Sequence, residues 1–182
     1  GPISNGNQYQ KVQDLIETGI KEGATLVAGG PGRPEGFNKG YFARPTVFAN
    51  VTNDMTIARE EIFGPVLPML TYQSLEELIG NLKKLPEYPL ALYLFTSSDQ
   101  VERQVLDSTQ FGGGCINNTV MHVANPNLPF GGVGESGMGA YHGKNSFDAF
   151  SHKRSILKAT TLFDIKFRDA PYQDKVNMLK KM

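Results

Sequence analysis

The sequence predicts an α/β fold in which a mostly parallel β-sheet is flanked by helices. Short apolar runs alternate with amphipathic helical patterns through the first 117 residues, and such alternation is typical of strands joined by right-handed helical crossovers. The composition agrees, since 40% of the residues are hydrophobic and 20% are charged, as in ordinary globular proteins. At 182 residues the chain is long enough for one domain with its own core.

The first expected elements are a helix over residues 8–22 and a strand over residues 24–28. Apolar residues such as Val12 and Ile16 recur at helical spacing. Gly23 then stands where a left-handed cap residue is needed.

A less regular segment follows. Residues 29–40 are rich in Gly and Pro, which predicts turns. Residues 41–51 are strand-like but contain Pro45, and proline is confined mainly to sheet edges because it has no N–H to donate. We therefore predict an irregular or edge element here.

The middle of the chain has clearer signals. Residues 66–72 are β-prone, and Ser74 stands three residues before Glu77 in the arrangement of a capping box, which marks a helix start. Pro86 and Pro89 are expected to end this helix, whose apolar face comprises Leu75, Leu78, Ile79 and Leu82.

The next three elements are a strand, a helix and a strand. Residues 90–95 form an unbroken apolar run, typical of a strand that is buried on both faces of a parallel sheet. A helix is expected over residues 99–108 and a short strand over residues 114–117. We expect the strands at 66–72, 90–95 and 114–117 to share one sheet.

The remainder is irregular. Residues 118–145 concentrate Gly, Asn, Pro and His, which predicts a long loop with a function. A short helix around residues 146–150 and a strand-like run over residues 155–163 follow. The final stretch is polar and compatible with a terminal helix.

Charge and cysteine content restrict the partners. Lys plus Arg equals Asp plus Glu at 18 each, so no net field attracts nucleic acid or an anionic membrane. Cys115 is the only cysteine, which excludes an internal disulfide, and no apolar run reaches the ~18 residues of a membrane span. The first residues show no secretory signal. We expect a cytoplasmic protein.

The glycine-rich loop contains a G-x-G-x-x-G string at Gly132, Gly134 and Gly137. A dinucleotide-binding turn needs an apolar strand before this string and an apolar helix after it, and neither is present. We therefore interpret these glycines as a loop whose backbone packs closely against a neighbour.

Two further residue types were considered for chemistry. Cys115 could be a nucleophile, but its place in a short strand after a glycine run favours a packed structural residue. The histidines His122, His142 and His152 lie 20 and 10 residues apart, so no pair has the spacing of a metal site. No metal ligand is predicted.

Three stretches together resemble the aldehyde dehydrogenase superfamily: residues 1–30, residues 58–70 (AREEIFGPVLPML) and residues 128–143 (LPFGGVGESGMGAYHG). Their order and spacing match as well, and the resemblance covers residues 1–160. It implies that these residues form the C-terminal portion of a catalytic domain, including the strand that leads to the assembly region. Residues 161–182 would be a C-terminal tail.

The resemblance also implies roles for three residues. Within the superfamily, this sequence looks most like the branch that contains fatty-aldehyde and aromatic-aldehyde enzymes. Glu61, the second glutamate of E-E-I-F-G-P, would accept hydrogen bonds from the nicotinamide-ribose hydroxyls of NAD or NADP, although an acidic pair such as Glu60 and Glu61 is by composition most often a solvated helix end. Phe63 would lie against the nicotinamide, and Phe130 would line the aldehyde pocket.

The family's catalytic cysteine, general-base glutamate, oxyanion-holding asparagine and dinucleotide-binding domain have no counterpart in these residues. The family reaction oxidises an aldehyde through thiolate attack, hydride transfer to NAD(P)+ and thioester hydrolysis. We therefore expect no catalytic residue in this chain and no activity from it alone. We also expect a homo-oligomer, assembled through the edge at residues 155–160. The alternative is a non-catalytic binding or assembly module that keeps the fold without the chemistry.

Overall fold

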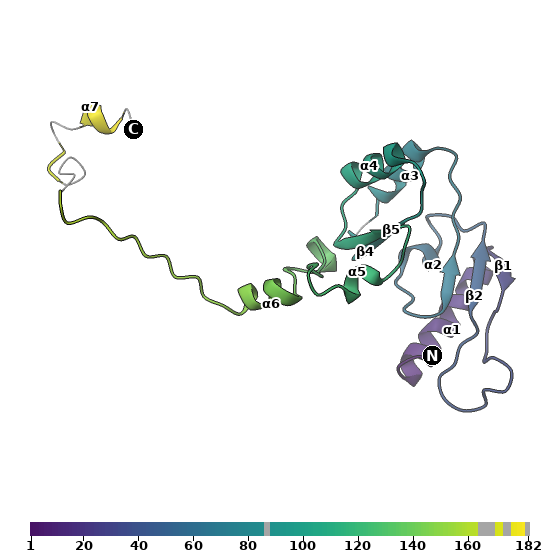
Figure 1. The fold of residues 1–182 in the computed structure, drawn as a ribbon. Helices are drawn as coiled ribbons and strands as arrows, with labels where there is room; N and C mark the ends of the chain where they lie inside the picture. Colours follow the sequence, from purple (N-terminus) through teal and green to yellow (C-terminus); the bar gives the residue numbers. More distant parts are fainter. Residues whose placement is uncertain (86–87, 164–169, 173–175, 181–182) are drawn as a thin grey trace.

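The structure, a computed structural model, describes residues 1–85, 88–163, 170–172 and 176–180 (Figure 1). Helices and strands alternate along the chain, which confirms the α/β class. The elements are α1 (Gly6–Lys21), β1 (Thr25–Ala28), β2 (Thr46–Ala49), α2 (Thr56–Arg59), β3 (Val66–Pro68), α3 (Leu75–Leu82), β4 (Ala91–Leu94), α4 (Asp99–Ser108), β5 (Gly113–Ile116), α5 (Met121–Ala124), the 3₁₀ turn η1 (Gly134–Ser136), α6 (Gly143–Ala149) and α7 (Val176–Leu179).

The strands form two small sheets. In the first, β1 pairs antiparallel with β2, and β2 pairs parallel with β3. In the second, β4 pairs parallel with β5. The pairing is therefore mostly parallel, as predicted. The expectation of one shared sheet was wrong, because β3 uses β2 as its neighbour and does not meet β4. An apolar run predicts a strand, but it does not specify which strand lies beside it.

The first core forms where α1 packs on the first sheet. Asn5 caps α1 by accepting a hydrogen bond from the Gln8 amide at 2.9 Å. Val12 and Ile16 of α1 are fully buried in a cluster with Phe48 of β2. The amphipathic pattern of the sequence thus correctly predicted which face of α1 is buried.

The prediction of an edge element around Pro45 was wrong. β2 is the central strand of the first sheet, and Phe48 in it has no exposed surface. Pro45 lies just before the strand, and the first ladder bond from this strand is donated by the Thr46 amide to the Pro65 carbonyl at 2.8 Å. The proline therefore removes no donor from the ladder.

Helix α3 begins with the predicted Ser74 cap, but the second bond of the predicted capping box is displaced by one residue, to Gln73. The Ser74 hydroxyl accepts a hydrogen bond from the Glu77 amide at 3.1 Å, and the Glu77 carboxylate accepts one from the Gln73 amide at 2.7 Å. The helix ends at Leu82, and Pro86 lies outside the described residues. Helix α4 has the predicted bounds, and Figure 1 shows α3 and α4 together on one side of β4 and β5.

The second sheet is less covered than predicted. β4 and β5 are each half-buried on average, and Tyr93 and Phe95 are 39% and 65% exposed. The expectation that residues 90–95 are buried on both faces was therefore wrong for this structure. Helices α3 and α4 lie on one side, and the short helix α5 packs against β5, so among the described residues this two-stranded sheet keeps partly exposed apolar side chains.

Regular structure is sparse after β5, as predicted for residues 118–145. Helix α6 begins three residues earlier than expected, at Gly143. Residues 155–163 form no strand, contrary to the prediction; they are exposed and extended, and Figure 1 shows this segment leading away from the packed part. An isolated segment has no neighbouring strand with which to pair. The division at residue 160 and the assembly role stay predictions. None of the helices described is long and apolar enough to cross a bilayer.

Candidate functional site

The loop between α2 and β3, residues 60–65, is held in place by α1. Gln8 donates a side-chain hydrogen bond to the Ile62 carbonyl at 2.8 Å, and the Lys11 ammonium contacts the Glu61 carbonyl oxygen at 3.2 Å. The Ile62 side chain is buried in the first core. The loop backbone is thus anchored while the Glu61 carboxylate remains exposed.

The Phe63 side chain points out of this loop, whereas the Ile62 side chain is buried. Gly64 lies so close to α1 that a Cβ placed on it would be 2.6 Å from a Val12 methyl group. Phe63, which lies between Ile62 and Gly64 in the sequence, is 76% exposed and has a φ of 50°. A left-handed backbone is unusual for a bulky aromatic residue, and such strain is found most often where a side chain is held for a function.

Glu61 lines a cleft of about 710 Å³ between the end of α2, the residues before β4 and the 3₁₀ turn η1. Among the described residues, the charged and polar side chains around it are three carboxylates, one guanidinium and two hydroxyls. Within the described residues no salt bridge involves the Glu61 carboxylate. An excess of carboxylates disfavours phosphate and favours ligand groups that donate hydrogen bonds, such as hydroxyls. These groups belong to Arg59, Glu60, Glu61, Tyr88, Glu135 and Ser136.

The glycines of the G-x-G-x-x-G string serve their own loop. The Ser136 hydroxyl accepts from the Val133 amide at 2.9 Å and donates to the Val133 carbonyl at 3.0 Å. A Cβ on Gly132 would be 2.1 Å from the Ser136 carbonyl oxygen, and Gly134 has a φ of 60°. These positions need glycine because the loop folds back on itself, which agrees with the close backbone packing expected from the sequence.

Phe130 lies in a cluster of aromatic rings. Its backbone pairs with Tyr141 through two hydrogen bonds of 3.0 Å. Its ring centroid is 5.6 Å from Tyr141 in an edge-on arrangement, 6.1 Å from His142 in a stacked one and 5.8 Å from His122. The ring is half-buried and held from several sides, which suits a rigid wall.

Sequence reasoning missed one pair. The Cys115 sulfur lies 3.5 Å from Nδ1 of His122, whose side chain is only 6% exposed. The spacing of the histidines from one another carries no information on the cysteine seven residues before His122. The sequence signal for this pair is a short strand followed directly by a turn. Such a turn can bring a residue after the strand, here His122, back against the strand. No group of three or more potential metal ligands occurs in the described part of the chain.

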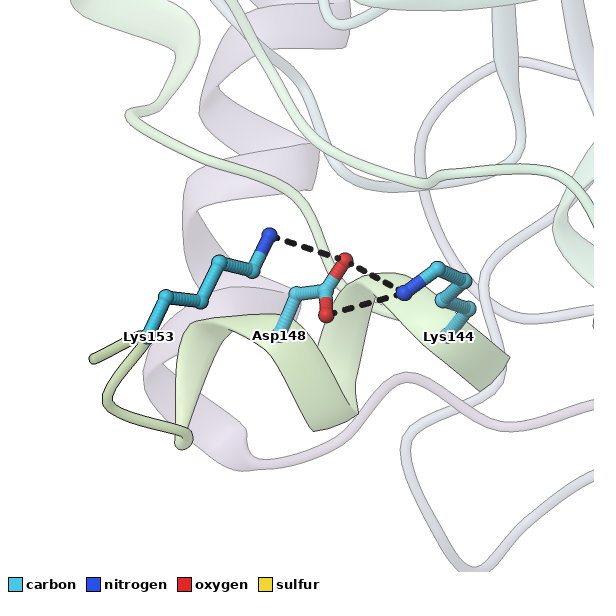
Figure 2. A network of polar contacts seen from close by, with 3 residues as sticks. All are labelled: Lys144, Asp148 and Lys153. Carbon is cyan, nitrogen blue, oxygen red and sulfur yellow. Dashed lines mark hydrogen bonds and ion pairs between the residues drawn. The ribbon is translucent and has the colours of Figure 1, made fainter. Parts of the chain in front are cut away.

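The carboxyl groups whose pKa is shifted lie outside the Glu61 cleft. A hydrogen bond from Thr52 lowers the pKa of Asp54, and the amide of Glu76 itself lowers the pKa of that glutamate at the start of α3. A hydrogen bond from Lys144 lowers the pKa of Asp148, and Lys153 adds to this effect (Figure 2). These three shifts arise from contacts at the protein surface.

The structure therefore brings together only part of the predicted site. Glu61 meets η1 of the glycine-rich loop across the cleft, whereas Phe63 and Phe130 are not among the residues that line it. No contact joins Glu61, Phe63 and Phe130 to one another in the described residues. Their assignment to cofactor and substrate stays a prediction.

The fold and these motifs define the class of protein. The family model described as "Aldehyde dehydrogenase family" matches residues 1–156. The chain belongs to the aldehyde dehydrogenase family.

Individual relatives agree. A 4,4'-diaponeurosporen-aldehyde dehydrogenase of Staphylococcus aureus is 42% identical over 180 residues, which are 99% of this chain and 38% of that protein. A substrate-bound aldehyde dehydrogenase structure from Staphylococcus aureus superposes with a TM-score of 0.85 at 42% identity, covering 100% of this chain and 38% of the other. A mutant aldehyde dehydrogenase C of Pseudomonas syringae with NAD+ and octanal gives 0.74 at 40% identity, covering 82% and 30%. The chain thus spans between 30% and 38% of the length of these relatives.

Proposed function

We propose that this chain supplies nicotinamide-contacting residues and part of the substrate pocket to an NAD(P)-dependent aldehyde dehydrogenase. The observation that carries the proposal is the anchored loop at residues 60–65, which presents Glu61 and Phe63 to solvent while the Ile62 side chain is buried and Gly64 lies against Val12. Among the described residues, no ring contact or salt bridge involves the exposed Phe63 ring or the exposed Glu61 carboxylate. Both suit a bound ring and a bound diol.

The residues present fit the nicotinamide end of the cofactor. The Glu61 carboxylate has two acceptor oxygens for the two hydroxyls of a ribose, and the carboxylate-rich cleft favours hydroxyls over phosphates. Phe63 offers a flat apolar face to a planar ring. When bound, NAD or NADP would accept the hydride that leaves the aldehyde carbon. The chain's own residues would fix the orientation of that end of the cofactor.

The substrate end would involve Phe130. Its ring is held between Tyr141 and two histidine rings, and it would form an apolar wall for an aldehyde chain. The Pseudomonas syringae relative is a complex with octanal, and the Staphylococcus aureus relative is named a 4,4'-diaponeurosporen-aldehyde dehydrogenase. We propose an aldehyde with an apolar chain as the substrate class, oxidised to the carboxylic acid.

The role of Glu61 is tested in a full-length protein that carries this segment. Glu61→Gln keeps one acceptor oxygen and loses the charge, so we expect cofactor affinity to fall about tenfold, or ~1.4 kcal/mol, with slower turnover. Glu60→Gln is the matched control, because it changes the same charge in the same cleft. Unchanged cofactor affinity and rate in Glu61→Gln would remove Glu61 from the site.

We propose that the 182 residues by themselves do not oxidise aldehydes. Only two or three contacts at one end of the cofactor would have to offset an association cost of about 4–15 kcal/mol. The test follows reduced cofactor by absorbance with NAD+ or NADP+ and a panel of aliphatic and aromatic aldehydes. Turnover that disappears in Cys115→Ser would overturn this proposal and make Cys115 a catalytic nucleophile.

A second candidate function is assembly without catalysis. It is favoured by the exposed apolar side chains after β5, where Phe147 and Phe150 are 70% and 93% exposed. An inactive chain that still binds a full-length family member would support it. A homo-oligomeric state and a cytoplasmic location, the latter in keeping with the single cysteine, are part of the proposal.

A further inference from the structure

Cys115 and His122 form a pair for which the proposed cofactor contacts and substrate wall have no use as a pair, although the His122 ring also packs against Phe130. The sulfur and Nδ1 of the imidazole are 3.5 Å apart, and the cysteine is partly exposed whereas the histidine is 6% exposed. The cysteine residue is therefore not closed off from solvent, while the nitrogen beside its sulfur belongs to a buried ring.

The absence of a side chain at Gly113 allows the His122 ring to lie close to Cys115. Gly113 lies two residues before Cys115 on β5, so both positions face the same side of the strand. A Cβ on Gly113 would be 3.1 Å from Cδ2 of His122, tighter than ordinary carbon contacts. The glycine therefore leaves the space that the imidazole ring occupies. The packing of α5 against β5 brings this ring back to the strand.

Two aromatic rings hold the imidazole. Tyr93, the register partner of Cys115 on β4, meets His122 edge-on at 5.8 Å, and Phe130 lies at the same centroid distance on a tilted plane. The second ring nitrogen, Nε2, is buried and has no hydrogen-bond partner within the described residues. Within the described residues the sulfur is thus the one hydrogen-bond partner of the ring, through Nδ1.

The ring protons follow from this geometry. When the Cys115 thiol donates to Nδ1, the neutral imidazole carries its own proton on Nε2. Nδ1 is then the basic nitrogen, and it faces the thiol proton directly. No third residue supports Nε2, so this pair lacks the orienting group that completes a catalytic triad.

We infer that Cys115 is a modification site for α,β-unsaturated carbonyl compounds, with His122 accepting the thiol proton. The sulfur lone pair forms a bond to the β-carbon, and the π electrons of the C=C bond move toward the carbonyl. The α-carbon then takes a proton, which His122 returns. The net reaction adds S–H across the double bond, with no leaving group, oxidant or reductant. The inference does not depend on the proposed aldehyde oxidation.

The test measures the rate at which the full chain forms an adduct with N-ethylmaleimide and with acrolein at neutral pH, by intact mass. Since Cys115 is the only cysteine, one adduct reports one site, and Cys115→Ser gives its background. His122→Phe keeps an aromatic ring against Tyr93 and Phe130 and removes the base. We expect it to slow both reactions about tenfold, below the roughly 10²–10⁴-fold contribution of a fully assembled general base.

His142→Phe is the matched control, because it changes a histidine of the same ring cluster that does not contact the sulfur. It should leave the rate unchanged. Equal rates for the original chain and for folded His122→Phe would overturn the inference. If His122→Phe does not fold, the original chain is compared in buffer and in denaturing urea. Burial alone would slow the folded thiol, so a folded rate at or above the unfolded rate supports the inference, and a slower folded rate overturns it.

Discussion

The two ends of the described chain differ in how they bury their apolar side chains. Ten hydrophobic residues between Ile3 and Ile62 form one buried cluster around α1 and the first sheet. Between residues 75 and 150, Ile79 and Val105 are the buried hydrophobic residues in the described part of the chain. The second region nevertheless keeps two parallel-paired strands and two capped helices. Backbone pairing and caps are therefore enough to define its elements, whereas packing defines the first region.

The two regions should therefore contribute differently to stability and to chemical accessibility. The packed region carries the loop that presents Glu61 and Phe63, so these side chains have a fixed base. The open region carries Phe130 and the Cys115–His122 pair, where access to solvent is greater. We expect stability to depend on the first region and chemical accessibility to depend on the second.

Truncation of one aromatic in each region gives the largest contrast. Phe48→Ala removes a ring with no exposed surface and should lower the free energy of unfolding by about 3–5 kcal/mol. Phe95→Ala removes a ring that is 65% exposed and should change it by about 0.5 kcal/mol or less. Urea unfolding followed by circular dichroism measures both. Similar losses for the two variants would show that the second region has a core of its own.

A glycine-to-alanine substitution should lower the free energy of unfolding in the first region and raise it in the second. Gly64→Ala would place a carbon 2.6 Å from a Val12 methyl group, and overpacking of this kind costs about 1–3 kcal/mol. Gly80→Ala in α3 meets nothing within 4 Å, and alanine in a helix interior is favoured over glycine by roughly 0.5–1 kcal/mol. The same unfolding assay decides; a stabilising Gly64→Ala would contradict the close approach of the loop to α1.

Association should involve the open region. Phe150 and Leu157 are 93% and 92% exposed, and an uncovered apolar surface favours self-association. We expect dimers or larger species in light scattering at micromolar concentrations. Phe150→Asn together with Leu157→Asn should shift the distribution toward monomer, and Val27→Asn on the first sheet is the control. A clean monomer for the original chain would remove the assembly prediction.

The smallest expected effect concerns Asp148, which contacts Lys144 and Lys153 at the end of α6 (Figure 2). Because its pKa is lowered in the folded chain, its contribution to stability is present above the pKa of the unfolded chain and is lost as pH falls through the lowered pKa. The group is exposed, so Asp148→Asn should leave unfolding at neutral pH unchanged within error. A carboxyl NMR titration should place its midpoint below that of an ordinary aspartate; a midpoint in the usual range would show that the contacts are not formed in solution.

The candidate site was only partly accessible to sequence reasoning. The resemblance identified Glu61, Phe63 and Phe130 from local motifs, and the structure places Glu61 on a cleft. It did not reveal that η1 forms the opposite wall, since residues 135 and 136 are distant in sequence. The contact between Cys115 and His122 depends on a turn after β5 that leaves no periodic signal.

The sequence by itself determined the helices and strands whose signals are local. The Ser74 cap of α3, the bounds of α4 and the left-handed Gly23 depend on neighbouring residues only, and each is present as predicted. Only the tertiary structure decided which strands pair, which faces are covered and that the strand after Pro45 is central. These outcomes depend on long-range packing: a strand signal has the same form whichever strand is its neighbour, and an apolar run does not specify which surface will cover it.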